Sequence, residues 1–281
     1  MLEEWIAQAE ERWLPSLNGY LLTAFSSTFL PSHDHLHHLR VWKQSVRLLT
    51  VLDKLGTGVD YNLVEGCLVA SMFHDVGLVR ESGEMHGPCG SDMCKEFFAE
   101  GNLEKPAAYR EILKAISFHD TKSRDVYAVF ERGKTPGILN ILSVADDLEA
   151  LGIIGIYRYS EIYLQRGVAL EKLGLQVQTN AFRRRSNLLN CCRHLPVFSS
   201  EIQDQHALLS DFFNLYNQQV LVVERPEKCS VGELGIINRL LQGMEEHIRP
   251  EEWADRLDPE TAGLTVSSYF NELEEILKQG D

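Results

Sequence analysis

Hydrophobic residues recur along nearly the whole chain with the period of an α-helix. Between residues 32 and 55, for example, Leu36, Leu39, Val46 and Leu49 are separated by three or seven positions. This spacing puts them on one side of a helix. Nearly every other segment follows the same rule, and only the Val-rich stretch 220–223 fits a strand as well as a helix end. We therefore expect an all-α protein.

Glycines and capping residues divide this pattern into separate helices. Gly56 should end the helix over 32–55, and Gly77 the helix after it. Asn62 is the expected N-cap of that second helix, with Glu65 as its capping-box partner. The predicted helices cover residues 2–14, 17–28, 32–55, 63–76, 87–98, 105–119, 138–151, 153–172, 178–194, 200–223, 231–248 and 266–279.

Composition and charge narrow the class of protein. The chain has 281 residues, of which 44% are hydrophobic and 24% are charged, as in one large or two small globular domains. Its formal net charge is -14, from 27 Lys and Arg against 41 Asp and Glu. Such a chain is repelled by phosphate backbones, so we expect no nucleic-acid partner. The basic run 183–185 is interpreted as a solvated face or as a donor of ion pairs between domains.

The sequence carries no sign of export or of membrane insertion. Residues 1–5 lack the basic and apolar regions of a secretory signal. No apolar run approaches the ~18 residues that span a bilayer. The six cysteines include no Cys-x-x-Cys pair and are too sparse for a disulfide scaffold. We expect reduced thiols, a cytoplasmic location and no membrane partner.

Histidines are concentrated in one part of the chain, together with acids that end buried helices. Seven of the ten histidines lie between residues 33 and 119. Asp75 follows the apolar run 67–73 and Asp146 follows the apolar run 141–145, so each carboxylate should need a cation to offset its burial. Imidazole with carboxylate suits Fe, Mn, Co or Zn better than Ca. The simpler alternative is a chance cluster on solvated helix ends.

Five short segments occur in an order that is found in a known family. They are His37–Val41, Met72–Gly77, His86–Gly90, Ile112–His119 and Ala145–Ala150. Together they resemble the HD-domain superfamily of metal-dependent phosphohydrolases over about residues 30–155. The similarity is greatest to the two-metal branch of bacterial diadenosine-tetraphosphate hydrolases, and it extends to the HD-GYP cyclic dinucleotide phosphodiesterases.

The resemblance implies an HD-domain helical bundle that holds two divalent transition metals. Fe or Mn is expected, and Co, Zn, Ni or Mg is compatible. Asp75 would bridge the two ions. The implied ligands are His37, His74, Asp75 and Asp146 for one ion and Asp75, His86 and His119 for the other. The implied reaction is hydrolysis of a nucleotide or another small phosphoester by a hydroxide held between the metals.

Three cations lie in loops next to these ligands and are candidates for binding the phosphates of a substrate. They are Arg80, Lys122 and Arg124. Many relatives carry a Lys where Leu78 stands here, so Arg80 could replace that phosphate contact. The simpler interpretation of each is a solvated loop cation. His33 and His35 are expected at the surface, although His33 is one turn from His37 and could instead lie behind that ligand.

Two departures from the HD-GYP pattern count against cyclic di-GMP turnover. No Gly-Tyr-Pro motif follows the His-Asp doublet, and Asp120 follows His119 where those proteins have a second histidine. We expect residues 1–30 to form N-terminal helices packed on the core, and the resemblance implies that residues 31–155 form the HD domain. Residues 156–281 form a helical region of unknown role that matches no family.

Two other functions stay open. The same six ligand types with iron could activate O2, as in an HD-fold di-iron oxygenase, although the 11-residue gap from Asp75 to His86 resembles the hydrolases more. Alternatively, the protein is a sensor or regulator whose helical second half binds partners. A homodimer also stays open.

Overall fold

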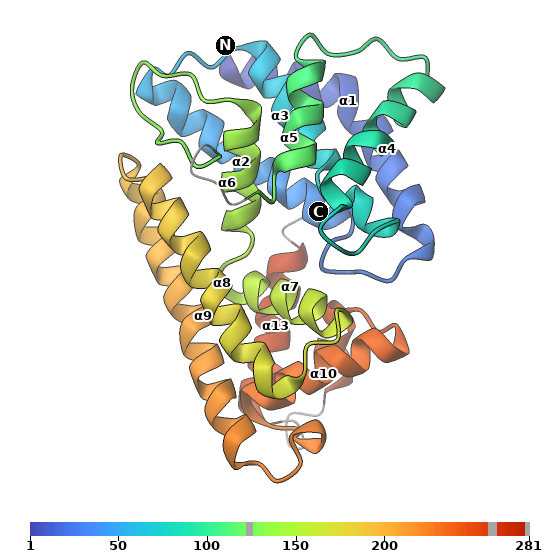
Figure 1. Ribbon diagram of the computed structural model, residues 1–281, viewed down its shortest axis with the longest axis vertical. Helices are drawn as coiled ribbons and strands as arrows, with labels where there is room; N and C mark the ends of the chain where they lie inside the picture. Colours follow the sequence, from blue (N-terminus) through green and yellow to red (C-terminus); the bar gives the residue numbers. More distant parts are fainter. Residues whose placement is uncertain (122–125, 258–262, 279–281) are drawn as a thin grey trace. The chain divides into compact units, whose positions relative to one another are not determined.

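The protein is all-α, as predicted. The computed structural model describes residues 1–121, 126–257 and 263–278, and within these ranges it contains helices and no strand (Figure 1). The chain forms two compact units. Unit 1 comprises residues 1–28, 33–148 and 187–199, and unit 2 comprises residues 29–32, 149–186 and 200–281.

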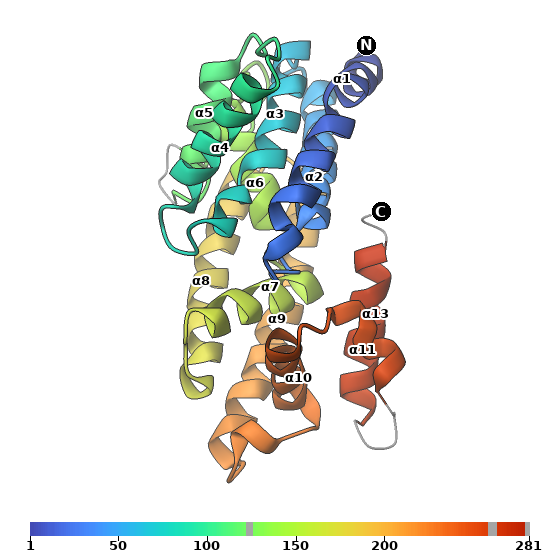
Figure 2. The same cartoon turned by 90° about the vertical axis from the view of Figure 1, so that its right-hand side faces the viewer.

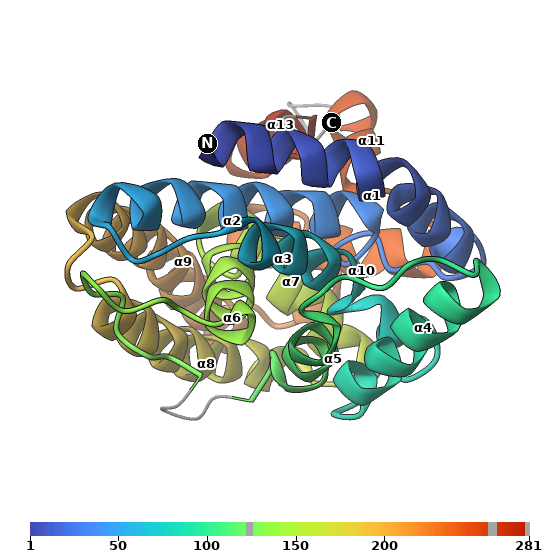
Figure 3. The same cartoon turned by 90° about the horizontal axis from the view of Figure 1, so that it is seen from above.

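Unit 1 is a bundle built around one apolar helix. Its helices are α1 (Leu2–Ala24), α2 (His35–Leu55), α3 (Tyr61–Phe73), α4 (His86–Glu100), α5 (Tyr109–Phe118) and α6 (Ile138–Leu148), with the 3-10 turns η1 (Phe25–Ser27) and η2 (Val76–Val79). Every residue of α3 from Leu63 onward is buried. A helix that is apolar all round needs neighbours on all sides, and α3 contacts α1, α2, α5 and α6 (Figure 3).

The N-terminal helix differs from its prediction. We expected two helices, over 2–14 and 17–28, but α1 continues through Pro15 to Ala24. Proline removes one backbone hydrogen bond and crowds the preceding turn. The buried stripe of Ala9, Trp13, Leu17 and Leu21 runs across the proline, so packing of this face holds the helix together.

The capping of α2 and α3 is partly as predicted. Gly56 ends α2 in the left-handed conformation, with φ of 73°. The N-cap of α3 is Asp60, whose carboxylate accepts a hydrogen bond from the backbone N–H of Leu63 at 2.8 Å. The predicted cap, Asn62, lies inside the helix. Glu65 is no capping partner, because its side chain accepts a hydrogen bond from the indole N–H of Trp13 at 2.8 Å.

One described segment, Tyr61–Val79, is long and apolar enough to cross a membrane by length and composition alone. This corrects the expectation that no segment approaches that length. Of its most apolar stretch, 89% is buried inside the structure, as expected for the core helix of a globular protein.

Unit 2 is also helical. Its helices are α7 (Gly152–Gln165), α8 (Leu170–Cys191), α9 (Pro196–Val222), α10 (Gly232–Glu246), α11 (Pro250–Arg256) and α13 (Leu264–Lys278), with the 3-10 turn η3 (Pro226–Lys228). The last residues of α8 and the first of α9 belong to unit 1. α7, α10 and α13 contact one another, and α11 lies beside α13 (Figure 2). α11 was not predicted, because seven residues show too little periodicity.

The ambiguous stretch 220–223 is the end of α9, which stops at Val222. All six cysteines are free thiols, in line with the prediction that they form no disulfide scaffold.

Candidate metal centre

The six predicted ligands lie together at the ends of five helices of unit 1. His37 is in the first turn of α2, where the carboxylate of Asp34 caps the helix by accepting from the backbone N–H groups of Leu36 and His37. The others are His74 and Asp75 at the end of α3, His86 at the start of α4, His119 directly after α5, and Asp146 in the last turn of α6. All six side chains are buried.

The first group surrounds one oxygen of Asp75. It consists of His37, His74, Asp75 and Asp146, whose ligand atoms all lie within 4.8 Å of one another. Asp75 Oδ2 lies 3.3 Å from His74 Nε2 and 3.5 Å from His37 Nε2. Asp146 Oδ1 lies 3.8 Å from Nε2 of His74 and 3.7 Å from Nε2 of His37.

The second group surrounds the other oxygen of the same carboxylate. Asp75 Oδ1 lies 3.0 Å from Nε2 of His119 and 3.4 Å from Nε2 of His86. Those two Nε2 atoms are 3.4 Å apart. Asp75 therefore joins two groups of buried side chains, each of which could hold a metal ion.

Backbone carbonyls orient three of the imidazole rings. The Nδ1 atoms of His74, His86 and His119 lie 2.7–2.8 Å from the carbonyl oxygens three residues earlier, those of Ser71, Gly83 and Ile116. A carbonyl oxygen can only accept, so each Nδ1 carries the proton. When such a ring is neutral, the lone pair is therefore on Nε2, which faces the centre. This arrangement is typical of histidines that bind metals.

The donor set of the centre fits a cation. Nε2 of His37 lies 3.1 Å from Nε2 of His74. Two facing nitrogen lone pairs repel each other unless a proton or a metal ion lies between them. Buried carboxylates on both sides add to the need for positive charge. The residues present therefore suit a divalent ion that binds imidazole and carboxylate.

The electrostatics of the centre lead to the same conclusion. Burial alone would raise the pKa of Asp75, but His74, His119 and His37 hold that pKa well below its usual value. Burial lowers the pKa of His86, but the hydrogen bond and the charge of Asp75 outweigh it and raise that pKa to about 9. The pKa of His74 is raised in the same way, since Asp75 outweighs the effect of burial. The centre thus attracts positive charge, as protons or as metal.

Glycines let the backbones that carry these ligands approach closely. A Cβ atom on Gly77 would lie 2.0 Å from the carbonyl oxygen of His86 and 2.6 Å from the nitrogen of Gly90. A Cβ atom on Gly87 would lie 2.8 Å from the carbonyl oxygen of Ser117. The turn after α3, the start of α4 and the end of α5 can come together only without side chains at these positions.

Of the three predicted phosphate-binding cations, the structure describes Arg80, which is paired with a carboxylate of α4. Arg80 is half-exposed and forms two hydrogen bonds to the carboxylate of Glu96, at 2.7 and 3.1 Å. Lys122 and Arg124 lie outside the described residues.

The prediction that His33 lies at the surface was wrong, because this side chain is buried and its ring centroid lies 5.4 Å from that of His37, as the alternative expected. His35 is half-buried.

The sequence analysis missed His38. This histidine is fully buried, and its Nδ1 lies 3.0 Å from the carbonyl oxygen of Ser71, which also accepts from His74. Burial lowers its pKa well below the usual value, so the ring is neutral. The signal was available, because position 38 continues the buried stripe of Val41, Ser45 and Leu48 on α2.

Comparisons with protein-family models, with curated proteins and with solved structures gave no match.

Proposed function

We propose that this protein is a metal-dependent phosphohydrolase of the HD superfamily that cleaves a nucleotide or another small phosphoester. One observation carries the proposal: the two oxygens of Asp75 face two separate pairs of histidine Nε2 atoms. A carboxylate that joins two cation sites is the arrangement that two-metal hydrolysis requires.

The chain's own residues would hold two ions and limit access of water to them. His37, His74 and Asp146 would bind one ion, His86 and His119 the other, and Asp75 both. When bound, such ions supply Lewis acidity and an activated water for attack on phosphorus. The carbonyls behind His74, His86 and His119 keep the rings oriented, so little reorganisation is needed during the reaction.

An anionic substrate can bind to this acidic protein only where positive charge is concentrated locally. The chain has a net charge of -14, so its overall field repels phosphate. Two divalent ions would reverse the local sign. Arg80 would add a further positive charge, provided that the substrate replaces Glu96 as its partner. Its guanidinium can bind two phosphate oxygens at once.

The test combines metal analysis with an activity screen. Protein purified without chelator is analysed for metals by mass spectrometry, then assayed on phosphomonoesters, phosphodiesters and nucleotides with Mn, Fe, Co and Mg. We expect two metals per chain and phosphate release that carries oxygen from labelled water. His37→Gln should abolish activity, whereas His35→Gln, two residues away on α2, should not. Full activity of His37→Gln would refute the proposal.

The same assays separate the two alternatives. An HD-fold di-iron oxygenase would consume O2, require iron and stop under argon, so hydrolysis that persists without oxygen and with Mn excludes it. A sensor would bind two metals but release no phosphate from any substrate. Arg80→Ala should raise KM or lower kcat without loss of metal if Arg80 binds the substrate.

A further inference from the structure

The segments of α8 and α9 that belong to unit 2 form an antiparallel pair. The side-chain amide of Gln178 on α8 donates to Oδ1 of Asn214 at 2.7 Å and to the carbonyl oxygen of Ser210 at 3.3 Å. The amide of Asn217 donates back to Gln178 at 3.0 Å. These contacts fix the register, in which residues near 178 lie level with residues 210–217.

One side of this pair packs into the hydrophobic core of unit 2. The buried residues are Leu173, Val177 and Ala181 of α8 and Leu209, Phe213 and Tyr216 of α9. These positions repeat every three or four residues, as a core-facing stripe does. The opposite side of the two helices is not part of this core.

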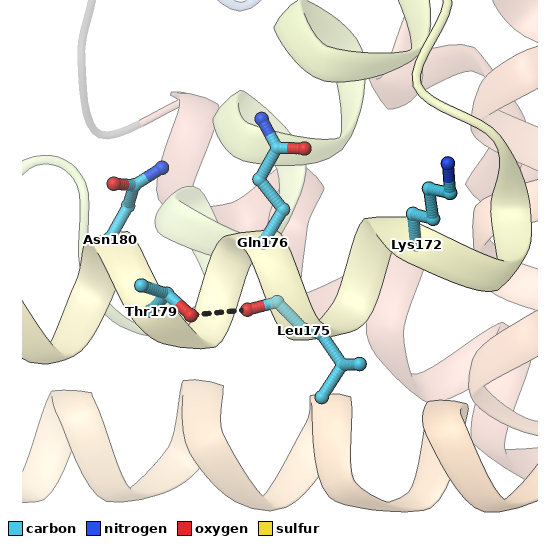
Figure 4. Close-up of a pocket in the computed structure, with 5 residues that line it drawn as sticks. All are labelled: Lys172, Leu175, Gln176, Thr179 and Asn180. Atoms are coloured by element: carbon cyan, nitrogen blue, oxygen red, sulfur yellow. Dashed lines mark hydrogen bonds between the residues drawn. The ribbon is translucent and has the colours of Figure 1, made fainter.

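That outer side carries large apolar residues at matching intervals. Leu175 and Phe182 of α8 are 65% and 61% exposed, and Leu215 and Val222 of α9 are 48% and 82% exposed. Each pair is separated by seven residues, or about two helical turns, so its members share one side of the helix. Figure 4 shows Leu175 directed away from the side of α8 that carries Gln176 and Asn180. Single exposed leucines are ordinary, but two regular pairs on neighbouring helices form a surface.

The two helices also carry opposite charge. Between residues 170 and 186, α8 has four basic residues and one acid, Glu171. Between residues 200 and 222, α9 has three acids and neither Lys nor Arg. The basic residues are Lys172, Arg183, Arg184 and Arg185, and the acids are Glu201, Asp204 and Asp211. Arg184 lies over the ring of Tyr159, whereas Lys172 and Arg183 of α8 and Asp204 and Asp211 of α9 are exposed. Exposed cations on one helix and exposed carboxylates on the next are complementary to a copy of the same pair.

We propose that this outer face, residues 170–186 of α8 and 200–222 of α9, is the interface of a homodimer. A two-fold axis parallel to the helices sets α8 of one copy opposite α9 of the other at the same height. By the register above, Leu175 then meets Leu215 of the second copy, and Arg183 comes within about one helical turn of Asp211. Two chains of charge -14 repel each other, and the basic stretch of α8 offsets that repulsion locally.

The first test measures mass in solution for the full-length chain. Light scattering coupled to size exclusion should give a dimer for the wild type and a monomer for Phe182→Asp. Leu22→Asp is the matched control, because Leu22 is an exposed leucine on α1, far from this face in the sequence. It should stay dimeric. A wild type that is monomeric up to its solubility limit, or a dimeric Phe182→Asp, overturns the proposal.

The second test identifies which helices face each other. Arg183→Asp and Asp211→Arg each place like charges across both contacts of the dimer, so each alone should dimerise at least about tenfold more weakly. In an equal mixture, the heterodimer has one natural contact and one with both charges reversed. Dimerisation should therefore return in the mixture.

Effects within one chain are the same in the separate and mixed samples, so the mixture reports only on contact between copies. Far-UV circular dichroism checks that each variant is folded. A mixture that associates no better than its components contradicts the pairing of α8 with α9.

Discussion

Oδ1 of Asp75 lies 3.0 Å from Nε2 of His119, although the two residues are 44 positions apart in the chain. The other oxygen of the same carboxylate lies 3.3 Å from Nε2 of His74, its neighbour in sequence. One side chain thus connects the end of α3 to the end of α5. The position of Asp75 defines the centre, and changes there should affect both groups of ligands.

Replacing Asp75 should therefore have a larger effect than replacing any histidine. Asp75→Asn removes the charge that both groups share, so both metals should be lost. His86→Gln and His119→Gln should each lose one metal and most activity, because the group of His37, His74, Asp75 and Asp146 keeps all four of its ligands. Metal content by mass spectrometry gives the count directly. Two metals retained by Asp75→Asn would contradict the assignment.

Gly77→Ala should destabilise the protein and weaken metal binding by His86. The added Cβ would lie 2.0 Å from the carbonyl oxygen of His86, so the start of α4 must move. Overpacking of this kind costs about 1–3 kcal/mol.

Gly19→Ala is the control for this change. Gly19 lies inside α1 and has no atom within 4 Å of an added Cβ, so alanine there should stabilise the protein by about 0.5–1 kcal/mol. Urea unfolding measures both variants. Equal effects of the two substitutions would rule out the close approach.

Glu65 should be important for the stability of unit 1. Its Oε1 accepts from Arg12 at 3.0 Å, from the buried Trp13 at 2.8 Å and from Tyr61 at 3.2 Å. Glu65→Ala leaves the indole N–H of Trp13 without this acceptor, and should cost about 2–4 kcal/mol in the free energy of unfolding. Glu65→Gln keeps an acceptor and should cost less.

Glu104→Ala provides a matched comparison. Glu104 also contacts Arg12, at 3.3 Å, but its side chain is 89% exposed. Its loss should change stability by less than about 0.5 kcal/mol. If both alanine variants unfold at the same urea concentration, the contacts of Glu65 contribute little.

Metal binding should release protons, and the release should depend on pH. Asp75 raises the pKa of His86 to about 9 against the effect of burial, so the metal-free imidazole is protonated near neutral pH. A metal needs the Nε2 lone pair, so binding below this pKa expels the proton, and binding well above it expels none from His86. Calorimetry with Mn²⁺ in buffers of different ionisation enthalpy counts the protons. His86→Gln should remove this part of the pH dependence, and equal release on both sides of the pKa would disprove it.

Local patterns singled out the two aspartates of the candidate centre, whereas the choice of its four histidines came from the resemblance to HD-domain sequences. Asp75 and Asp146 follow apolar runs, and a buried acid needs a cation wherever the chain later packs. Arg80 shows the limit of such reasoning. It stands near Asp75 in sequence, yet it binds Glu96, 16 positions further on, and only the path of α4 brings that carboxylate to it.

Some helix ends could likewise be predicted from the local sequence, whereas others depend on tertiary packing. Gly56 ends α2 as predicted, because a left-handed C-cap depends on one residue's own conformational freedom. Pro15 should end a helix by the same local argument, yet α1 continues through it, because its buried stripe packs on both sides of the proline.

The sequence by itself determined that the chain is helical, since apolar periodicity is a property of neighbouring residues. It also determined which side chains have the chemistry to bind metal. Only the tertiary structure decided that the two oxygens of Asp75 face different histidine pairs, that His33 is buried, and that Arg80 is paired with Glu96. These relationships join residues far apart in the chain, and their distances depend on how α2 to α6 pack around α3, which no local pattern encodes.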